Sequence, residues 1–379
     1  MMELNVRRAA LGAAAVLGAA VFAMNASARE LRFEPGLPCS HDLVKAYAYA
    51  EEELPKRTND ELTLRNYCSS LMALKEMSDG LRDGIADVGL TVLPYWPAEF
   101  PYNNFLSNIS GFADSAVAIS GANTEFVLNC EPCKQEFANK NQVVLAMYGN
   151  PPYVPIVNGE AMRNPEDFVG KKFRAGSIFF RRWAEFFDGK ALSMSGNEIY
   201  EGLNAGVLDA TLSTPTEIPN FGLQDVITSV TRLPIGTFHS MSLWAVNRDT
   251  WQSLTPEQRQ VLMDLAAEST AYALTHLDRQ FAEVFDQLEG WGVELVEPSP
   301  ELLAKQAAFA AKNFEESIKS GKEDFGVENP REAAEQFAET ARRWQKMMTE
   351  EIDRTDWKAV AELYKREIYS NIDAASYGM

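Results

Sequence analysis

One stretch of the chain, residues 170–209, alternates strand and helix signals and thereby limits the fold to the α/β class. It opens with GKKFR, which predicts a strand that follows a glycine turn and ends at Arg174. After an aromatic helix, residues 197–209 predict an amphipathic helix that stops at Gly206 and leads into another strand. Because the carboxyl ends of strands in a βαβ arrangement converge on one crevice, we expect the Arg174 guanidinium to point into a cleft.

The order of these motifs, GKKFR followed by NEIYEGLNAGVLDA, resembles the signature of the substrate-binding proteins of TRAP transporters, the DctP-like family. That family carries a Gly-x-Lys-φ-Arg strand, a Glu-Val-Tyr-x-x-Leu helix and a Gly-x-φ-Asp-Gly turn. Here Ala210 replaces the last glycine of the turn. Residues 81–88, LRDGIADV, match a second family pattern, Leu-x-x-Gly-x-φ-Asp-φ. The resemblance covers about residues 30–320.

The resemblance implies a two-lobed α/β fold of the periplasmic-binding-protein type (type II-like), with one long helix that spans both lobes and extra helices at the C-terminus. The Thr255-Pro256 pair predicts the start of that long helix, because Thr is a good cap and Pro suits the first helical position. The expected limits are 29–149 plus about 240–285 for lobe I, 150–239 plus about 286–345 for lobe II, and 346–379 for a C-terminal extension. The Gly-Asn-Pro-Pro turn at residues 149–152 is the expected hinge.

The first 28 residues have the pattern of an export signal. Arg7 and Arg8 form a basic start, residues 9–24 are apolar, and residues 26–28 read Ala-Ser-Ala, a typical cleavage site. A membrane anchor is the alternative, but the run is short and no stop-transfer charges follow it. We therefore expect a signal peptide cut after Ala28 and a protein of the periplasm. The arginine pair also hints at a twin-arginine signal, although its flanking residues match poorly.

The four cysteines suit an oxidising compartment. Three pairings are possible. We favour Cys39–Cys68, because both residues follow strands that should lie side by side, and this leaves Cys130–Cys133 to close a local loop. The Cys-Glu-Pro-Cys spacing also permits a redox site, but no thioredoxin-like βαβ frame surrounds it. A zinc site is disfavoured because no second pair of ligands lies at a suitable spacing.

Charge makes Arg174 a candidate for ligand recognition. Removal of the leader changes the net charge from −19 to −20, because Glu3 and two arginines leave with it. Such a surface repels nucleic acid, so an anionic ligand would need a local positive site. The resemblance implies that Arg174 binds the carboxylate of an organic acid. The alternative is an arginine that is ion-paired on the surface.

Four further candidates for the ligand site are aromatic. Tyr95 and Trp96 form either one wall of the cleft or a separate hydrophobic cluster. Most rings of the aromatic helix must face the core, but Phe179 lies near its start and can reach the cleft. Many family members place a second arginine where this chain has Tyr153 and Val154. This departure suggests a less polar pocket, or a carboxylate held by one arginine and neutral donors.

Two polar residues complete the expected site. Ser213 occupies the place where the family often has an asparagine that faces the ligand, and its hydroxyl can donate a hydrogen bond. His239 lies at the second crossing between lobes, where it is either a pH-sensitive ligand contact or a hydrogen-bonded structural residue. Asp87 and Asp209 are expected to brace turns after helices.

The resemblance implies the periplasmic solute-binding subunit of a TRAP transporter. Such a protein captures an organic acid by hinge closure and delivers it to the small and large integral membrane subunits. We expect a monomer that has no cofactor, binds no nucleic acid and is not an enzyme. One alternative is an exported sensing module for a membrane receptor. An exported hydrolase is disfavoured, because no Gly-x-Ser-x-Gly or HExxH motif occurs and the chain has three histidines.

Overall fold

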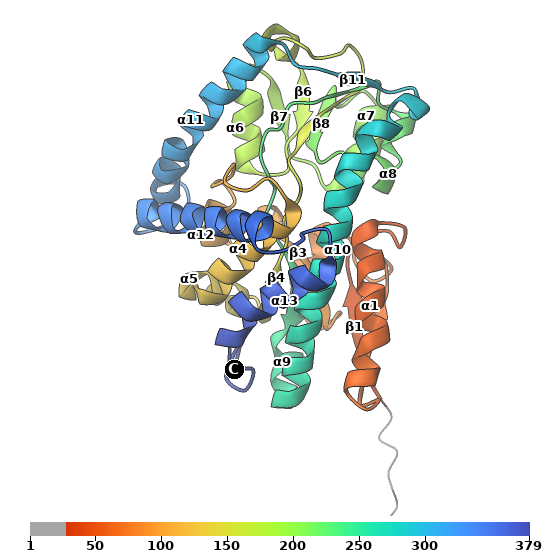
Figure 1. The fold of residues 1–379 in the computed structure, drawn as a ribbon, viewed down its shortest axis with the longest axis vertical. Helices are drawn as coiled ribbons and strands as arrows, with labels where there is room; N and C mark the ends of the chain where they lie inside the picture. Colours follow the sequence, from red (N-terminus) through yellow and green to blue (C-terminus); the bar gives the residue numbers. More distant parts are fainter. Residues whose placement is uncertain (1–27) are drawn as a thin grey trace, which may run out of the picture.

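The computed structural model describes residues 28–379 and contains two separate β-sheets, one above the other in Figure 1. The expected leader, apart from Ala28, lies outside the described residues. The first sheet has five strands, in the order β2 (Leu62–Asn66), β1 (Arg29–Glu34), β3 (Val88–Val92), β10 (Met241–Asn247) and β4 (Gln142–Met147). The strand β10 runs antiparallel to its two neighbours, and β1 runs parallel to β2 and β3.

The second sheet has six short strands, in the order β11 (Glu294–Val296), β9 (Ser229–Thr231), β5 (Val154–Val157), β8 (Ala210–Ser213), β6 (Lys172–Arg174) and β7 (Lys190–Leu192). The strand β6 runs parallel to β7 and β8, as the sequence predicts, and β5 runs antiparallel to β8. In this arrangement, Arg174 is the last residue of β6 and Ser213 is the last residue of β8. Both residues therefore lie near the same edge of the second sheet.

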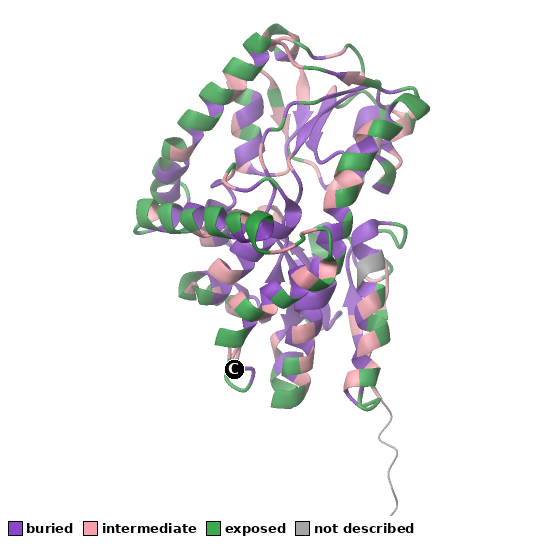
Figure 2. Ribbon diagram, in the orientation of Figure 1, coloured by how far each residue is buried: buried purple, intermediate pink, exposed green. Residues whose placement is uncertain are grey.

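Helices cover the sheets, and Figure 2 shows their buried sides turned toward the strands. The helices are α1 (Asp42–Arg57), α2 (Met77–Arg82), α3 (Pro101–Leu106), α4 (Ala116–Asn129), α5 (Glu131–Asn139), α6 (Ile178–Phe186), α7 (Ile199–Asn204), α8 (Glu217–Asn220), α9 (Arg248–Ser253), α10 (Pro256–Gln287), α11 (Pro300–Glu323), α12 (Pro330–Glu350) and α13 (Trp357–Glu367). Among residues 28–379, none of the helices has the length and apolar character needed to cross a membrane.

The long helix α10 connects the two halves of the molecule (Figure 1). It begins at the predicted Thr255-Pro256 pair, where Thr255 and Gln258 form a capping box, and it packs against α1 and α4. Near its end, Val284 is buried in the hydrophobic cluster of the second sheet. The expectation of a long helix that spans both lobes is therefore confirmed.

Two chain segments cross between the sheets side by side, and one of them is the expected hinge at residues 149–152. The backbone N–H of Asn150 donates to the carbonyl oxygen of Phe238 at 2.9 Å, and the N–H of Tyr153 donates to Gly236 at 2.9 Å. The two crossing segments are therefore joined by backbone hydrogen bonds where they leave the first sheet.

The C-terminal helices fold back onto the first half of the molecule (Figure 1). Helix α12 packs along α4, where Gly121 leaves room for the Trp344 ring and Trp344 Nε1 donates to Glu125 at 2.6 Å. In α13, the Tyr364 hydroxyl donates to the carbonyl oxygen of Val117 at 2.7 Å. The extra C-terminal helices are thus present, and α12 packs on α4 in the first half of the molecule.

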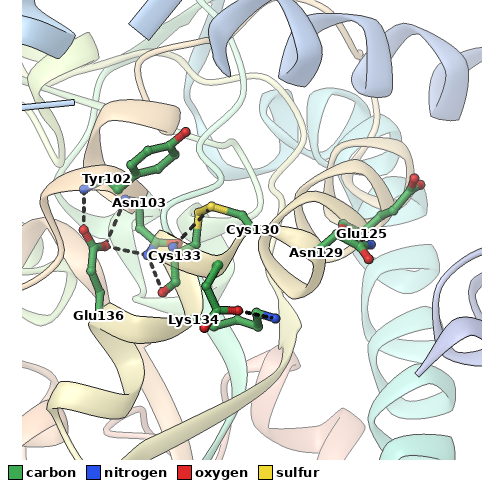
Figure 3. Close-up of a disulfide and its surroundings, with 9 residues drawn as sticks. Tyr102, Asn103, Glu125, Asn129, Cys130, Cys133, Lys134 and Glu136 are labelled. Carbon is green, nitrogen blue, oxygen red and sulfur yellow. Dashed lines mark hydrogen bonds and ion pairs between the residues drawn. A yellow bond between two sulfur atoms is a disulfide. The ribbon is translucent and has the colours of Figure 1, made fainter. Parts of the chain in front are cut away.

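Both preferred disulfides are present. Cys39–Cys68 joins the segments that follow β1 and β2, and Cys130–Cys133 lies at the start of α5. Figure 3 shows that Glu136, one turn further along α5, faces the start of α3 and accepts hydrogen bonds from the backbone N–H groups of Tyr102 and Asn103. The Cys-Glu-Pro-Cys segment therefore lies at the start of a helix that is hydrogen-bonded to the start of α3.

Candidate functional site

A cavity of about 80 Å³ lies between the two halves of the molecule. The first half contributes Leu37, His41 and Tyr95, and the second half contributes Arg174, Ser213 and Glu217. Tyr148, Asn150, Tyr153 and Phe238 line it from the crossing segments. Four of the predicted site residues, Tyr95, Tyr153, Arg174 and Ser213, are thus brought to one cavity.

Arg174 reaches the cavity from the end of β6, where the residue is 6% exposed. Its Nε atom donates to the carbonyl oxygen of Met194 at 3.0 Å. Within residues 28–379, no carboxylate lies within 4 Å of its guanidinium, so the alternative of a surface ion pair does not hold. Gly176 makes room for the guanidinium, because a Cβ there would lie 2.8 Å from Nη1 and 3.0 Å from Nη2.

Aromatic rings form much of the wall around Arg174. The Tyr153 ring stacks on Phe180 at 4.3 Å between ring centres, and its hydroxyl accepts a hydrogen bond from Asn150 Nδ2 at 3.3 Å. Burial raises the pKa of Tyr153 to about 12, and the nearby positive charge of Arg174 partly opposes this. Tyr153 is therefore a neutral phenol at physiological pH and can donate as well as accept.

Tyr95 and Ser213 add neutral polar groups from opposite sides of the cavity. The Tyr95 hydroxyl accepts a hydrogen bond from the backbone N–H of Gly196 at 3.1 Å, which links the two halves. Ser213 is buried at the end of β8, and its hydroxyl has no hydrogen-bond partner in the described part of the chain. A ligand in the cavity can therefore use this hydroxyl.

Three predicted site residues do not line the cavity. Trp96 packs partly buried against a small cluster of hydrophobic residues around Met77. Phe179 is buried edge-on against Phe180 and Phe309, in the core beside α11. The sequence could not separate these rings from Tyr95 and Tyr153, because helix and turn periodicity does not fix which side of a core faces a small cavity.

His239 is also buried away from the cavity. Its Nε2 lies 3.2 Å from the carbonyl oxygen of Leu106, its Nδ1 lies 3.4 Å from that of Thr237, and its ring stacks on Phe337. Burial lowers the pKa of His239 to about 4, so that the imidazole is neutral at pH 7. Its surroundings match the structural role considered for it, and its position does not support a ligand contact.

The expected turn-bracing roles of Asp87 and Asp209 agree with their contacts. Asp87 Oδ2 accepts from the backbone N–H and the Nε of Arg32, both at 2.9 Å, and its Oδ1 accepts from Thr250. Asp209 Oδ2 accepts from the backbone N–H of Lys172 at 2.7 Å. Neither residue lines the cavity.

Sequence reasoning missed a pair of residues in the cavity, His41 and Glu217. His41 is the N-cap of α1, and its Nδ1 accepts a hydrogen bond from the N–H of Leu43. Its Nε2 lies 3.2 Å from Glu217 Oε2 across the two halves of the molecule. Nothing in the sequence pairs two residues so far apart in the chain.

Among residues 28–379, no group of three or more His, Cys, Asp or Glu side chains is placed to hold a metal ion. The polar groups of the cavity are instead one guanidinium, one carboxylate, an imidazole and several neutral hydroxyl and amide groups. This set can bind an anion and form hydrogen bonds to the rest of a small molecule.

Comparison with known proteins gives the family. The family model of the DctP proteins, described as bacterial extracellular solute-binding protein family 7, matches residues 37–320. A solute-binding protein of Albidiferax ferrireducens is 25% identical over 280 residues, which cover 73% of this chain and 79% of that protein. The 2,3-diketo-L-gulonate-binding periplasmic protein of Escherichia coli is 24% identical over 64% of this chain and 73% of its own length.

Solved structures agree on the fold. A marine metagenome TRAP solute-binding protein, in complex with 3-hydroxybenzoate, has a TM-score of 0.75 at 19% identity and covers 84% of this chain and 99% of its own. A TRAP solute-binding protein of Rhodoferax ferrireducens with copurified benzoate has a TM-score of 0.75 at 15% identity, with coverage of 84% and 99%. One from Bordetella bronchiseptica with bound mandelate has a TM-score of 0.70 at 22% identity, with coverage of 83% and 99%. The chain therefore belongs to the DctP family, the solute-binding proteins of TRAP transporters.

Proposed function

We propose that this protein binds a small aromatic monocarboxylate in the cavity between its lobes and presents it to the membrane subunits of a TRAP transporter. The observation that carries the proposal is the Arg174 guanidinium, which is buried in the cavity and has no carboxylate within 4 Å in the described structure. A buried charge without a counter-charge is costly, so a ligand carboxylate that enters the cavity gains a strong partner.

The geometry of Arg174 supports a forked contact with the carboxylate. Because Nε is used by the Met194 carbonyl oxygen, the two Nη groups remain to donate to a ligand. Charge-assisted hydrogen bonds from a guanidinium to a carboxylate are frequently bidentate. Ser213 and Tyr153 supply neutral donors in the same cavity, and Tyr153 stands where many family members carry a second arginine.

The size and walls of the cavity favour a compact, ring-containing acid. A volume of about 80 Å³ admits roughly six water-sized groups, which corresponds to one small ring with its carboxylate. Aromatic walls such as Tyr153, Phe221 and Phe238 suit a flat apolar ring. Similar folds carry 3-hydroxybenzoate, benzoate and mandelate, which are acids of this kind.

We assign one lobe to each sheet. The ligand binds between the lobes and stabilises their closed arrangement. Contacts already cross the cleft: Lys75 Nζ lies 2.7 Å from Glu198 Oε2, and Asn197 Nδ2 donates to the carbonyl oxygen of Gly36 at 3.1 Å. A ligand that touches both lobes binds the closed form better than the open form, and this difference drives closure about the crossing at residues 149–152. The closed form is then the one that the membrane subunits recognise.

The remaining expectations stay part of this proposal. The protein acts in the periplasm after removal of residues 1–28, works as a monomer, and binds its solute without converting it. A thermal-shift screen across aromatic, keto and aliphatic acids, with the uncharged amide of each acid as control, tests the proposal. Stabilisation by one class of acids and none by their amides supports it. Equal stabilisation by an acid and its amide, or none by any acid, contradicts it.

A further inference from the structure

The cavity contains a second charged group, Glu217, that carboxylate recognition does not use. We propose that Glu217 is a specificity-determining residue that accepts a hydrogen bond from the ligand, so that the preferred solutes are monocarboxylates that also carry a hydroxyl or ammonium group. This inference rests on the proposed function, because it assumes that Arg174 holds the carboxylate of the same ligand.

Glu217 is positioned to face the ligand. It is the first residue of the short helix α8, which follows the strand that ends at Ser213, and it lines the cavity although its side chain is buried, with 8% of the residue exposed. Its Oε2 lies 3.2 Å from His41 Nε2. The carboxylate is therefore fixed between the two lobes rather than free in solvent.

The proton on His41 can be placed from its contacts. Nδ1 of His41 accepts a hydrogen bond from the backbone N–H of Leu43 at 3.2 Å, so the neutral imidazole carries its proton on Nε2. Nε2 then donates to Glu217 Oε2. The Phe221 ring packs edge-on against the imidazole at 5.3 Å between ring centres, which holds the ring in this orientation.

The other oxygen of Glu217 is the free acceptor. Between residues 28 and 379, no donor lies within hydrogen-bond distance of Oε1. A carboxylate oxygen in a narrow, mostly buried cavity is poorly solvated, and a donor on the ligand replaces the lost water. Glu217, held by His41, thus offers a hydrogen-bond acceptor in the same cavity as Arg174.

Arg174 and Glu217 both influence the Tyr153 ring. The pKa of Tyr153, which burial raises, is lowered by the positive charge of Arg174 and raised by the negative charge of Glu217. Arg174 and Glu217 therefore both lie near Tyr153 in the wall of the cavity, and one is cationic while the other is anionic. A monocarboxylate with a donor at its far end satisfies both, whereas a second carboxylate would face Glu217 with like charge.

The competing explanation is that the His41–Glu217 contact only holds the lobes together. Removal of such a contact would weaken all ligands equally.

The test therefore compares ligands that share the benzoate frame: benzoate, 3- and 4-hydroxybenzoate, 3-(aminomethyl)benzoate and the dicarboxylate isophthalate. Calorimetric titration of the full exported protein measures their affinities in wild type, Glu217→Gln and the control Glu201→Gln. Gln keeps the size and can still accept from His41, and Glu201 is an exposed carboxylate on α7 of the same lobe.

We expect wild-type protein to bind at least one of the donor-bearing acids about tenfold more tightly than benzoate, because hydrogen bonds to charged groups are strong. Comparison of the hydroxybenzoates with 3-(aminomethyl)benzoate shows whether the site prefers a hydroxyl or an ammonium donor. Isophthalate should bind more weakly than benzoate. Glu217→Gln should reduce the preference for the donor to threefold or less and improve isophthalate relative to benzoate, while Glu201→Gln should change neither ratio.

The inference fails if no donor-bearing acid exceeds benzoate in wild type, or if Glu217→Gln weakens every ligand by the same factor. Both results leave the proposed function standing, since benzoate would still bind through Arg174. Failure of the proposed function has a different signature, namely no binding by any of these acids, or acid binding that Arg174→Ala does not change. Melting temperatures of the variants confirm that each remains folded.

Discussion

The Nε of Arg174 donates a hydrogen bond to the carbonyl oxygen of Met194 at 3.0 Å, which fixes the plane of the guanidinium and leaves both Nη groups for a ligand. Met194 follows β7, the edge strand that pairs with β6. The proposed carboxylate-binding residue is thus oriented by the backbone that follows the neighbouring strand. This relationship makes the shape of the guanidinium, as well as its charge, part of the proposed site.

Replacement of Arg174 by Lys tests the importance of that shape. Lys keeps the positive charge but lacks the planar fork and the bond to the Met194 carbonyl, so we expect affinity for the carboxylate to fall about tenfold with little change in melting temperature. Calorimetric titration measures the change. Arg163→Lys, at an exposed position in the same half of the molecule, is the control. Wild-type affinity in Arg174→Lys would show that charge alone suffices.

Gly176 provides a way to disturb the guanidinium without removing its charge. A Cβ at this position would lie 2.8 Å and 3.0 Å from Nη1 and Nη2 of Arg174, so Gly176→Ala should displace the fork and weaken binding about tenfold. Gly290→Ala is the matched control, since a Cβ there meets no atom within 4 Å. Equal affinities of the two variants, measured by titration, would mean that the fork is not positioned as described.

The buried His239 should make the protein less stable in mild acid. Its pKa of about 4 in the folded protein lies below the usual value of 6.5, so between these values the unfolded chain binds a proton that the folded chain does not. Stability is therefore lost as the pH falls from 6.5 to 4, by about 3 kcal/mol from this residue. Urea unfolding at pH 7, 5.5 and 4 measures this loss.

His239→Gln should reduce the pH dependence within that window, because Gln does not titrate, although its stability at pH 7 should also be lower. The comparison uses the slope of unfolding free energy against pH, not its absolute value. A variant slope equal to the wild-type slope between pH 6.5 and 4 would show that another group is responsible.

The Cys39–Cys68 disulfide should affect both stability and binding. It closes a loop with a sequence separation of 29, and His41 of the cavity lies two residues beyond Cys39. We expect the double Ser variant to lose about 3 kcal/mol of stability and to bind its ligand more weakly. The Cys130–Cys133 double Ser variant, which opens a separation of only 3, should lose less stability and keep its affinity. Unfolding and titration data that rank the two pairs in the opposite order would refute this.

The parts of the fold that could be predicted are those that depend on local sequence. The strand that ends at Arg174 and the capped start of α10 at Thr255 carry strong local signals, and both are present. The position of α12 could not be predicted, because an amphipathic helix shows which face is apolar but not which partner covers it. Its contact with α4 depends on Gly121 and Trp344, which are far apart in the chain.

The same distinction applies to the site. Arg174 could be found because a cation at the end of a strand, in a family-like motif, has one expected direction. His41 and Glu217 could not be found, because a histidine and a glutamate at the starts of two helices are ordinary residues until the fold brings them together. The Cys39–Cys68 disulfide was predictable because adjacent strands bring the segments that follow them together, and this choice left Cys130 to pair with Cys133.

The most direct test of the account is the affinity of Arg174→Ala for the best acid found in the screen, measured by calorimetry beside wild-type protein and with the uncharged amide of that acid. We predict that wild type binds the acid and not its amide, and that Arg174→Ala, with an unchanged melting temperature, binds the acid at least 100-fold more weakly. An Arg174→Ala protein that binds the acid as tightly as wild type would contradict the assignment of Arg174 as the carboxylate-binding residue.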